Sequence, residues 1–157
     1  MSHEFLLWIA LSFYSAHILE EYNYDWKSWV NSISPISVDW SSFYITNFVV
    51  IVFGFCCAQI GWKLPEFSMI YISLMWINAV FFHILPTIFF RKFSPGLFTA
   101  IFLFLPIVAW CYYGAYLDGK LSIQVLIVSN LGGFVVMLFP VILAKTKKHR
   151  LLTNKSN

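Results

Sequence analysis

The sequence predicts an all-α protein that crosses a membrane about five times, and two observations support this prediction. The chain of 157 residues is 60% hydrophobic and only 11% charged, whereas soluble domains carry roughly 25% charged residues. Its apolar residues also fall into runs of about 20, the helix length that a bilayer core requires. Because a soluble domain of this size cannot bury so much apolar surface, we expect a single transmembrane helical domain over residues 1–144.

Short polar or proline-containing stretches separate the predicted spans. Lys63-Leu64-Pro65 closes the second span, Ser94-Pro95-Gly96 precedes the fourth, and Asp118-Gly119-Lys120 is a turn before the fifth. Proline is tolerated in the first turn of a helix, so Pro95 is expected to open the fourth span. The five spans are expected at about 5–21, 40–62, 67–90, 95–117 and 121–144.

A short amphipathic helix is expected between the first two spans. Trp26, Trp29, Val30 and Ile33 recur at helical spacing in an otherwise polar stretch, a pattern typical of a helix lying in the membrane interface. The Ser34-Pro35 pair would end this helix. Asp39 or Ser41 can then cap the start of the second span.

The distribution of Lys and Arg predicts an orientation. If the C-terminus is cytoplasmic and there are five spans, eight of the 10 basic residues lie inside and two outside, as the positive-inside rule requires. The N-terminus would then lie outside. The tail over residues 145–157 reads as a cytoplasmic anchor for the membrane surface. Its charge does not indicate a nucleic-acid partner.

Polar residues at the end of the first span call for an explanation. Glu20 and Glu21 follow His17 by three and four residues, which places all three on one face of a helix. A carboxylate in the hydrocarbon region costs roughly 2.5–3.5 kcal/mol. Either the glutamates mark the point where the helix leaves the membrane, or they form a metal site or an acid/base site at its edge.

Polar residues of the second and third spans favour the second interpretation. Counted from the cytoplasmic ends, His17, Asn47 and His83 lie at depths that agree within about 5–8 Å, and Asn78 lies about one and a half turns deeper than His83. These side chains can therefore converge on one layer. The alternatives are that Asn47 and Asn78 only join helices by hydrogen bonds, and that His83 donates to a carbonyl freed by Pro86.

The chemistry of this set suits a divalent metal or acid/base catalysis. Imidazole with carboxylate favours zinc, iron or manganese, and the expected ligands are His17, Glu20, Glu21 and His83. Without a metal, a buried glutamate beside a histidine is a general acid/base pair. Amides could then orient water or substrate, which makes the expected catalytic residues Glu20, Glu21, His17, Asn78 and Asn47.

The sequence resembles the small polytopic membrane proteins named for their HxxEE motif. His17-Ile-Leu-Glu20-Glu21 carries the motif, and the similarity continues through Asn78, His83 and Phe93-Ser-Pro-Gly-Leu-Phe-Thr99 to Pro106. Phe93 stands where the pattern usually has tyrosine. The resemblance covers roughly residues 10 to 110 and implies no substrate. Because the family is mainly bacterial, it implies the cytoplasmic (inner) membrane of a bacterium.

These observations favour an enzyme acting on a lipid-soluble or membrane-bound substrate at a His/Glu/Asn site near the cytoplasmic side. Arg91 and Lys92 would lie at the headgroup level, where they either hold a substrate phosphate or serve only as positive-inside residues. One alternative is a non-enzymatic transporter or accessory protein with a polar relay or a metal-binding layer. Another is a structural bundle. A carrier is disfavoured because the outer halves of the spans are almost wholly apolar.

Overall fold

The structure is a computed structural model that describes residues 2–35 and 37–153, and these form helices joined by short loops without a β-strand. The predicted all-α class is therefore confirmed. The α-helices are α1 (Leu6–Asn23), α2 (Trp26–Ile33), α3 (Trp40–Ile60), α4 (Pro65–Ile77), α5 (Leu85–Phe90), α6 (Leu97–Thr99), α7 (Leu105–Leu117) and α8 (Ile123–Thr153). The 3₁₀ turns are η1 (His3–Phe5) and η2 (Gly61–Lys63), and the π-helical segments are η3 (Asn78–Ile84) and η4 (Ala100–Phe104).

Four continuous helical stretches in the described part of the chain are long and apolar enough to cross a membrane. They correspond to the second to fifth predicted spans, with boundaries that differ by a few residues. They are Trp40–Lys63, Pro65–Phe90, Leu97–Leu117 and Ile123–Leu143.

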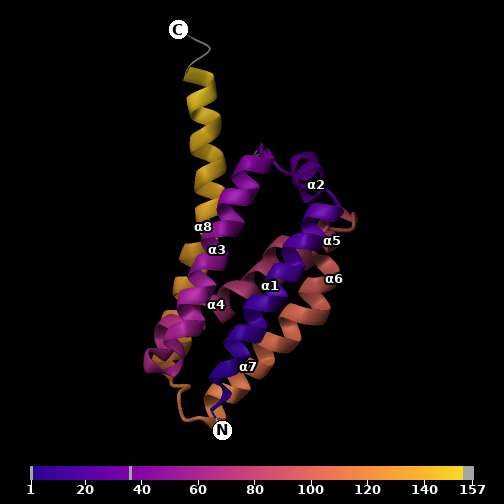
Figure 1. Cartoon of the computed structure of the whole chain (residues 1–157). Coiled ribbons are helices and arrows are strands. Elements are labelled where there is room, and N and C mark those ends of the chain that lie inside the picture. Colours follow the sequence, from indigo (N-terminus) through magenta and orange to yellow (C-terminus); the bar gives the residue numbers. More distant parts are fainter. Residues whose placement is uncertain (1, 36, 154–157) are drawn as a thin grey trace.

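The first predicted span forms α1, which is not one of these four. Its His17 and two glutamates lower its hydropathy. At 1.5 Å per residue its 18 residues are still about 27 Å long. It lies against α3 on one side and α7 on the other, and Figure 1 shows it running along the bundle with them. Four of the about five predicted spans are therefore supported in the described part of the chain, and α1 as a membrane span stays a prediction.

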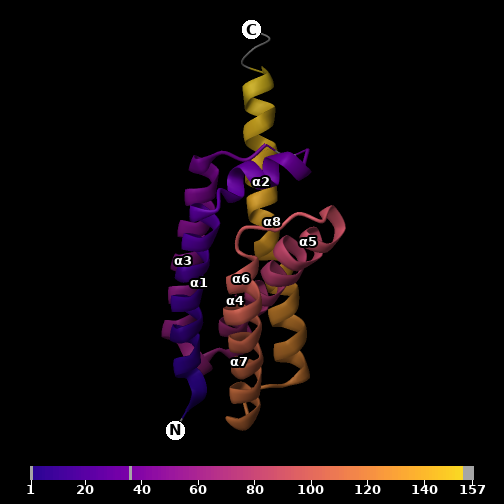
Figure 2. The ribbon, with the colours of Figure 1, turned by 90° about the vertical axis from the view of Figure 1, so that its right-hand side faces the viewer.

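The helix α4 lies at the centre of the bundle and contacts helices from both earlier and later parts of the chain. This helix makes its most extensive contact with α8 and also packs against α3 and α7. The bundle core is apolar and includes Leu6, Tyr71 and Phe104, all fully buried. Figure 2 shows the chain leaving the bundle sideways at α5 and returning through a loop to α6. This excursion places the loop over residues 91–96 beside the end of α1.

The short helix predicted between the first two spans is α2. Figure 2 shows it lying across the end of the bundle instead of along it. The carboxylate of Asp25 accepts the N–H of Ser28 at its start. Asp39, one of the two predicted caps, accepts the N–H of Ser42 at 2.8 Å and begins α3. The side chains that Ser, Thr, Asp and Asn offer at such positions satisfy N–H groups that lack a partner within the helix.

Both π-helical segments end two residues before a proline. η3 ends at Ile84 and precedes Pro86, and η4 ends at Phe104 and precedes Pro106. Proline has no N–H to donate, and its ring clashes with the carbonyl four residues earlier. A wider turn accommodates this clash, and such turns are frequent at functional sites. His83 lies within the first of the two segments.

α8 continues beyond the bundle into the basic tail and ends at Thr153. Figure 1 shows this extension standing clear of the other helices. The tail predicted over residues 145–157 is therefore helical at its start, and residues 154–157 lie outside the described part. The predicted orientation of the termini stays a prediction.

The N-terminus is fastened to the turn after α7 through Asp118. This carboxylate accepts the backbone N–H of His3, pairs with the His3 imidazole at 2.7 Å, and accepts the indole N–H of Trp62 at 2.8 Å. The backbone and side-chain hydrogen bonds from His3, with that from Trp62, hold the pKa of Asp118 well below its ordinary value. The contact joins the start of the chain to two other helix ends.

This pairing predicts a loss of stability in acid. A carboxyl group with a depressed pKa in the folded protein stabilises it above the unfolded pKa of about 3.9, and this contribution fades as the pH falls below that value. The melting temperature in detergent should therefore fall from about pH 5 to about pH 3 by more in the wild type than in Asp118→Asn. Equal losses in the two proteins would contradict this role of Asp118.

Candidate metal centre

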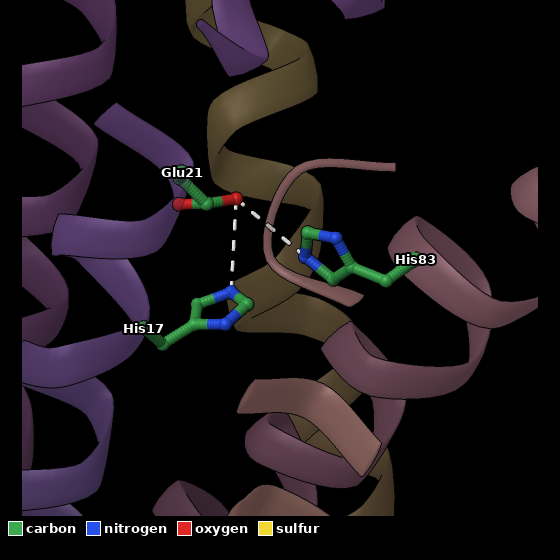
Figure 3. Close-up of side chains that lie close together, drawn as sticks. All are labelled: His17, Glu21 and His83. Atoms are coloured by element: carbon green, nitrogen blue, oxygen red, sulfur yellow. Dashed lines mark ion pairs between the residues drawn. The ribbon is translucent and has the colours of Figure 1, made fainter. Parts of the chain in front are cut away.

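Three side chains from two helices converge inside the bundle: His17 and Glu21 from α1, and His83 from η3. The Nε2 atom of His17 lies 3.6 Å from Oε1 of Glu21, and that of His83 lies 3.5 Å from the same oxygen. Figure 3 shows both rings directed at this carboxylate. One potential ligand atom from each residue lies within 4.8 Å of the others.

The cluster is shielded from its surroundings. Both histidines are 0% exposed and Glu21 is 5% exposed. The two imidazole rings are nearly perpendicular, with centroids 4.7 Å apart, and the ring of Phe104 lies 4.4 Å from that of His17. A carboxylate in such surroundings is costly unless a positive group compensates its charge.

Hydroxyl groups determine which nitrogen of each imidazole carries hydrogen. Nδ1 of His17 lies 2.7 Å from Oγ1 of Thr99, and this hydroxyl donates its hydrogen to the carbonyl of Gly96. A hydroxyl has a single hydrogen, so a Thr99 that donates to Gly96 accepts from His17. In that arrangement Nδ1 of His17 carries the hydrogen and Nε2 carries a lone pair.

His83 follows the same pattern with a serine. Its Nδ1 lies 3.0 Å from Oγ of Ser94, and that hydroxyl donates to the carbonyl of Pro95. The ring thus also presents a lone pair at Nε2. The partner of His83 Nδ1 is therefore the hydroxyl of Ser94, whereas the alternative interpretation expected a backbone carbonyl near Pro86.

The two Nε2 atoms are buried, and neither has a hydrogen-bond partner in the described part of the chain. Both Nε2 atoms face the same oxygen of Glu21, and separations of 3.5 and 3.6 Å are too long for hydrogen bonds of normal strength. Neighbouring ligands of a tetrahedral zinc site, with bonds of about 2.0–2.1 Å, lie roughly 3.3 Å apart. The donor set therefore fits a divalent metal ion.

Glu20 does not join this cluster. Its carboxylate accepts the backbone N–H groups of Gly96 (3.2 Å), Phe98 (3.1 Å) and Thr99 (2.7 Å), which are otherwise unpaired donors at the start of the helix over residues 97–117. This differs from the prediction that Glu20 is a metal ligand. The reason is that α1 presents Glu20 to the 91–96 loop and Glu21 to the histidines.

Gly96 brings this loop close to both imidazoles. It adopts φ +92°, which L side chains rarely tolerate, and a Cβ built on it would lie 2.7 Å from Cε1 of both His17 and His83. A residue with positive φ cannot belong to a right-handed helix. The helix therefore begins after Gly96, at Leu97, and not at Pro95. Glycine is therefore required here by conformation and by space.

The two asparagines lie at the edge of a cleft next to Glu21. The cleft has an empty volume of about 650 Å³, part of it open to the surroundings, and is bounded by α1, α2, α3, η3 and α8. Asn47 donates to the carbonyl of Phe43 and accepts from the hydroxyl of Tyr14. Asn78 lies near the His17 imidazole, and its Oδ1 atom is buried without a partner.

Sequence reasoning did not assign roles to Ser94 and Thr99, although each pairs with one of the predicted histidines. Both belong to the Ser-Pro-Gly-x-x-Thr segment that carries part of the resemblance described above, and this was the available signal. Arg91 and Lys92, considered for a substrate phosphate, do not line the cleft.

Comparison with known proteins finds a matching family. The family described as "Protein of unknown function with HXXEE motif" matches residues 8–111. The chain belongs to this family. His17, Glu20 and Glu21 form the HXXEE motif, and the matched region also contains His83, Ser94 and Thr99. It ends before α8, so one wall of the cleft lies outside the HXXEE match.

One curated relative of this HXXEE protein is the "Uncharacterized protein YrkK" of Bacillus subtilis (strain 168), which is 31% identical over 68 residues. That alignment covers 43% of this chain and 43% of the relative, so the chain spans less than half of the relative's length. No solved structure matches the chain.

Proposed function

We propose that this protein is a membrane-embedded enzyme in which His17, Glu21 and His83 hold a divalent metal ion beside a cleft for a lipid-soluble substrate. The observation that supports the proposal is the pair of buried Nε2 atoms that face one carboxylate oxygen and have no hydrogen-bond partner among the described residues. Zinc, iron and manganese all accept such ligands. Three protein ligands with a further position open are typical of catalytic sites, whereas structural sites are usually closed.

Each neighbouring group has a defined task in this proposal. Thr99 and Ser94 hold the two imidazoles in the tautomer that exposes Nε2. Glu21 lies at the boundary between the histidines and the cleft. The free Oδ1 of Asn78 would orient a water molecule or a polar group of the substrate. A bound ion would act as a Lewis acid or lower the pKa of a bound water.

Acid/base catalysis without a metal uses the same residues. Glu21 would then exchange a proton with one imidazole, and the hydroxyl groups would keep the rings oriented. Metal content separates the two versions, because only the metal-dependent one requires an ion.

The experiment is elemental analysis of protein purified in detergent without chelator. We expect about one zinc, iron or manganese ion per wild-type chain, and less than about a tenth of that in His17→Ala, Glu21→Ala and His83→Ala. His149→Ala, which changes a histidine of the basic tail, should retain the ion. Wild-type protein without a stoichiometric metal would overturn the metal-dependent version. If the three variants changed stability alone, the chain would be a structural bundle.

Removal of the Thr99 hydroxyl should weaken metal binding without displacing a ligand. Thr99→Val keeps the shape of the side chain but leaves Nδ1 of His17 without its acceptor. Loss of such an outer partner lowers metal affinity by about 10- to 100-fold. Competition with a chelator of known affinity measures this change. Thr146→Val is the matched control, because the Thr146 hydroxyl bonds to carbonyls of its own helix, far from the histidines in the sequence. Unchanged affinity in Thr99→Val would contradict the prediction.

A further inference from the structure

The cleft beside Glu21 has walls that suit a lipid. Val50 and Phe43 of α3, Phe82 of η3 and Met137 of α8 contribute apolar surface to it. A ligand in this cleft would therefore place an apolar body between α3 and α8.

The charges around the cleft disfavour an anionic head group. Among the described residues, the fourteen that line the cleft include no Lys, Arg or His, and Glu21 is the single charged one. Phosphate is normally recognised by Arg, Lys or clustered N–H groups.

Two polar atoms of the residues that line the cleft differ in hydrogen-bonding character: one is an acceptor and the other is a donor. Oδ1 of Asn78, which lies close to the His17 imidazole, and Nε1 of Trp26 are both buried without a hydrogen bond of normal geometry among the described residues. A buried polar group without a partner costs about 1–3 kcal/mol, so each favours a ligand or a water that supplies one. Asn47 and Tyr14 already bond to each other. A hydroxyl group can both donate and accept.

We propose that the cleft binds a neutral lipid alcohol, with its hydroxyl group near Asn78 and its apolar body along Val50 and Met137. This inference rests on the proposed function, since it names the substrate class of the same site. It narrows the class of lipid-soluble substrates to uncharged ones that carry a hydroxyl group. It also leaves Arg91 and Lys92 without a part in substrate recognition.

The test is photolabelling of the protein in nanodiscs by a long-chain 1-alkanol that carries a diazirine near the middle of its chain. We expect labels on the peptides that contain Val50 and Met137. An unlabelled alkanol of equal length should compete at least tenfold better than the corresponding alkyl phosphate or carboxylate. Equal competition by the phosphate would overturn the inference.

Substitutions in the cleft test where the alkanol binds and where its hydroxyl group lies. Val50→Trp should fill the cleft and reduce labelling at least tenfold, whereas Val49→Trp, on the exposed side of the same helix, should not. Met137→Trp and its exposed neighbour Leu138→Trp form a second matched pair on α8. Asn78→Leu keeps the volume of the side chain and should lower labelling by the alkanol, but not by a diazirine alkane. Labelling that none of these changes reduces would place the alcohol elsewhere.

Metal content measured on the same samples distinguishes the two proposals. Val50→Trp should keep its metal while losing the label. If the alkanol labels the cleft as expected but the wild-type protein holds no metal, the metal-dependent function fails and the lipid-alcohol site stands. If metal is present and the alkyl phosphate competes equally, the lipid-alcohol site fails and the metal site stands.

Discussion

Replacement of Gly96 with alanine is expected to reduce metal occupancy at least tenfold while the bundle stays folded. The new Cβ would lie 2.7 Å from Cε1 of both histidine rings, well inside the distance at which carbon atoms touch. Since Gly96 also has φ +92°, alanine there adds backbone strain of roughly 1–2 kcal/mol. The rings must move apart, and three ligand atoms that now lie within 4.8 Å of one another would no longer share one ion.

Gly119→Ala is the matched control for this experiment. Gly119 also has a positive φ, +64°, but a Cβ there would meet nothing within 4 Å. The control therefore carries comparable strain without contact with the histidines, and it should keep full metal content. Elemental analysis and a thermal melt of both variants separate the two effects. Gly96→Ala with wild-type metal content would show that the imidazoles can take up another arrangement, against the proposed geometry.

Glu20→Ala is expected to destabilise the protein by about 2–4 kcal/mol, because three backbone N–H groups would lose their acceptor and each unsatisfied donor costs about 1–3 kcal/mol when buried. The total cost is smaller than the sum of the three penalties, because Glu20 is only half-buried and water can donate to or accept from part of the exposed groups. The 91–96 loop should also loosen, and metal affinity should fall with it. Unfolding in a mixed detergent titration measures the free energy.

Glu66→Ala is the control for the loss of an acidic residue near a helix start. Glu66 lies in the first turn of α4, where a carboxylate contributes only about 0.3–1 kcal/mol through the helix dipole. Glu20→Ala should therefore be the more damaging of the two by at least about 1 kcal/mol. Equal effects would mean that the contacts of Glu20 with the 91–96 loop add little to stability.

The sequence was sufficient to predict the helices, because their signals are local. Apolar runs of about 20 residues predicted the second to fifth spans. The spacing of Trp26 and Trp29 predicted α2, and Asp39 predicted the start of α3. The widened turns over η3 and η4 were not predicted. Proline marks a disturbance in a helix, but whether the chain kinks, breaks or widens there depends on the packing around it.

The site could be predicted in outline and not in detail. Depth counting from helix ends brought His17 and His83 to one layer, and the structure places them together. The choice between Glu20 and Glu21 was not available from spacing, since consecutive residues of a helix point about 100° apart and both lie within a turn of His17. Which one faces the histidines depends on what α1 packs against.

The hydroxyl partners of the histidines illustrate a second limit. Thr99 is 82 residues from His17 along the chain, and no periodic pattern connects the two. Ser94 is only 11 residues from His83, but the intervening chain leaves the bundle and returns. Such contacts depend on the path of a loop, which local propensities determine poorly.

The widened turn that holds His83 makes the centre sensitive to chain length. In a regular helix each residue advances the direction of its side chain by about 100°. Deletion of one residue between Ile77 and Ile84 would let this stretch relax into ordinary α-helix and would swing the imidazole away from Glu21, although every ligand would still be present in the chain. The centre should therefore tolerate the exchange of apolar residues in this stretch far better than the gain or loss of one.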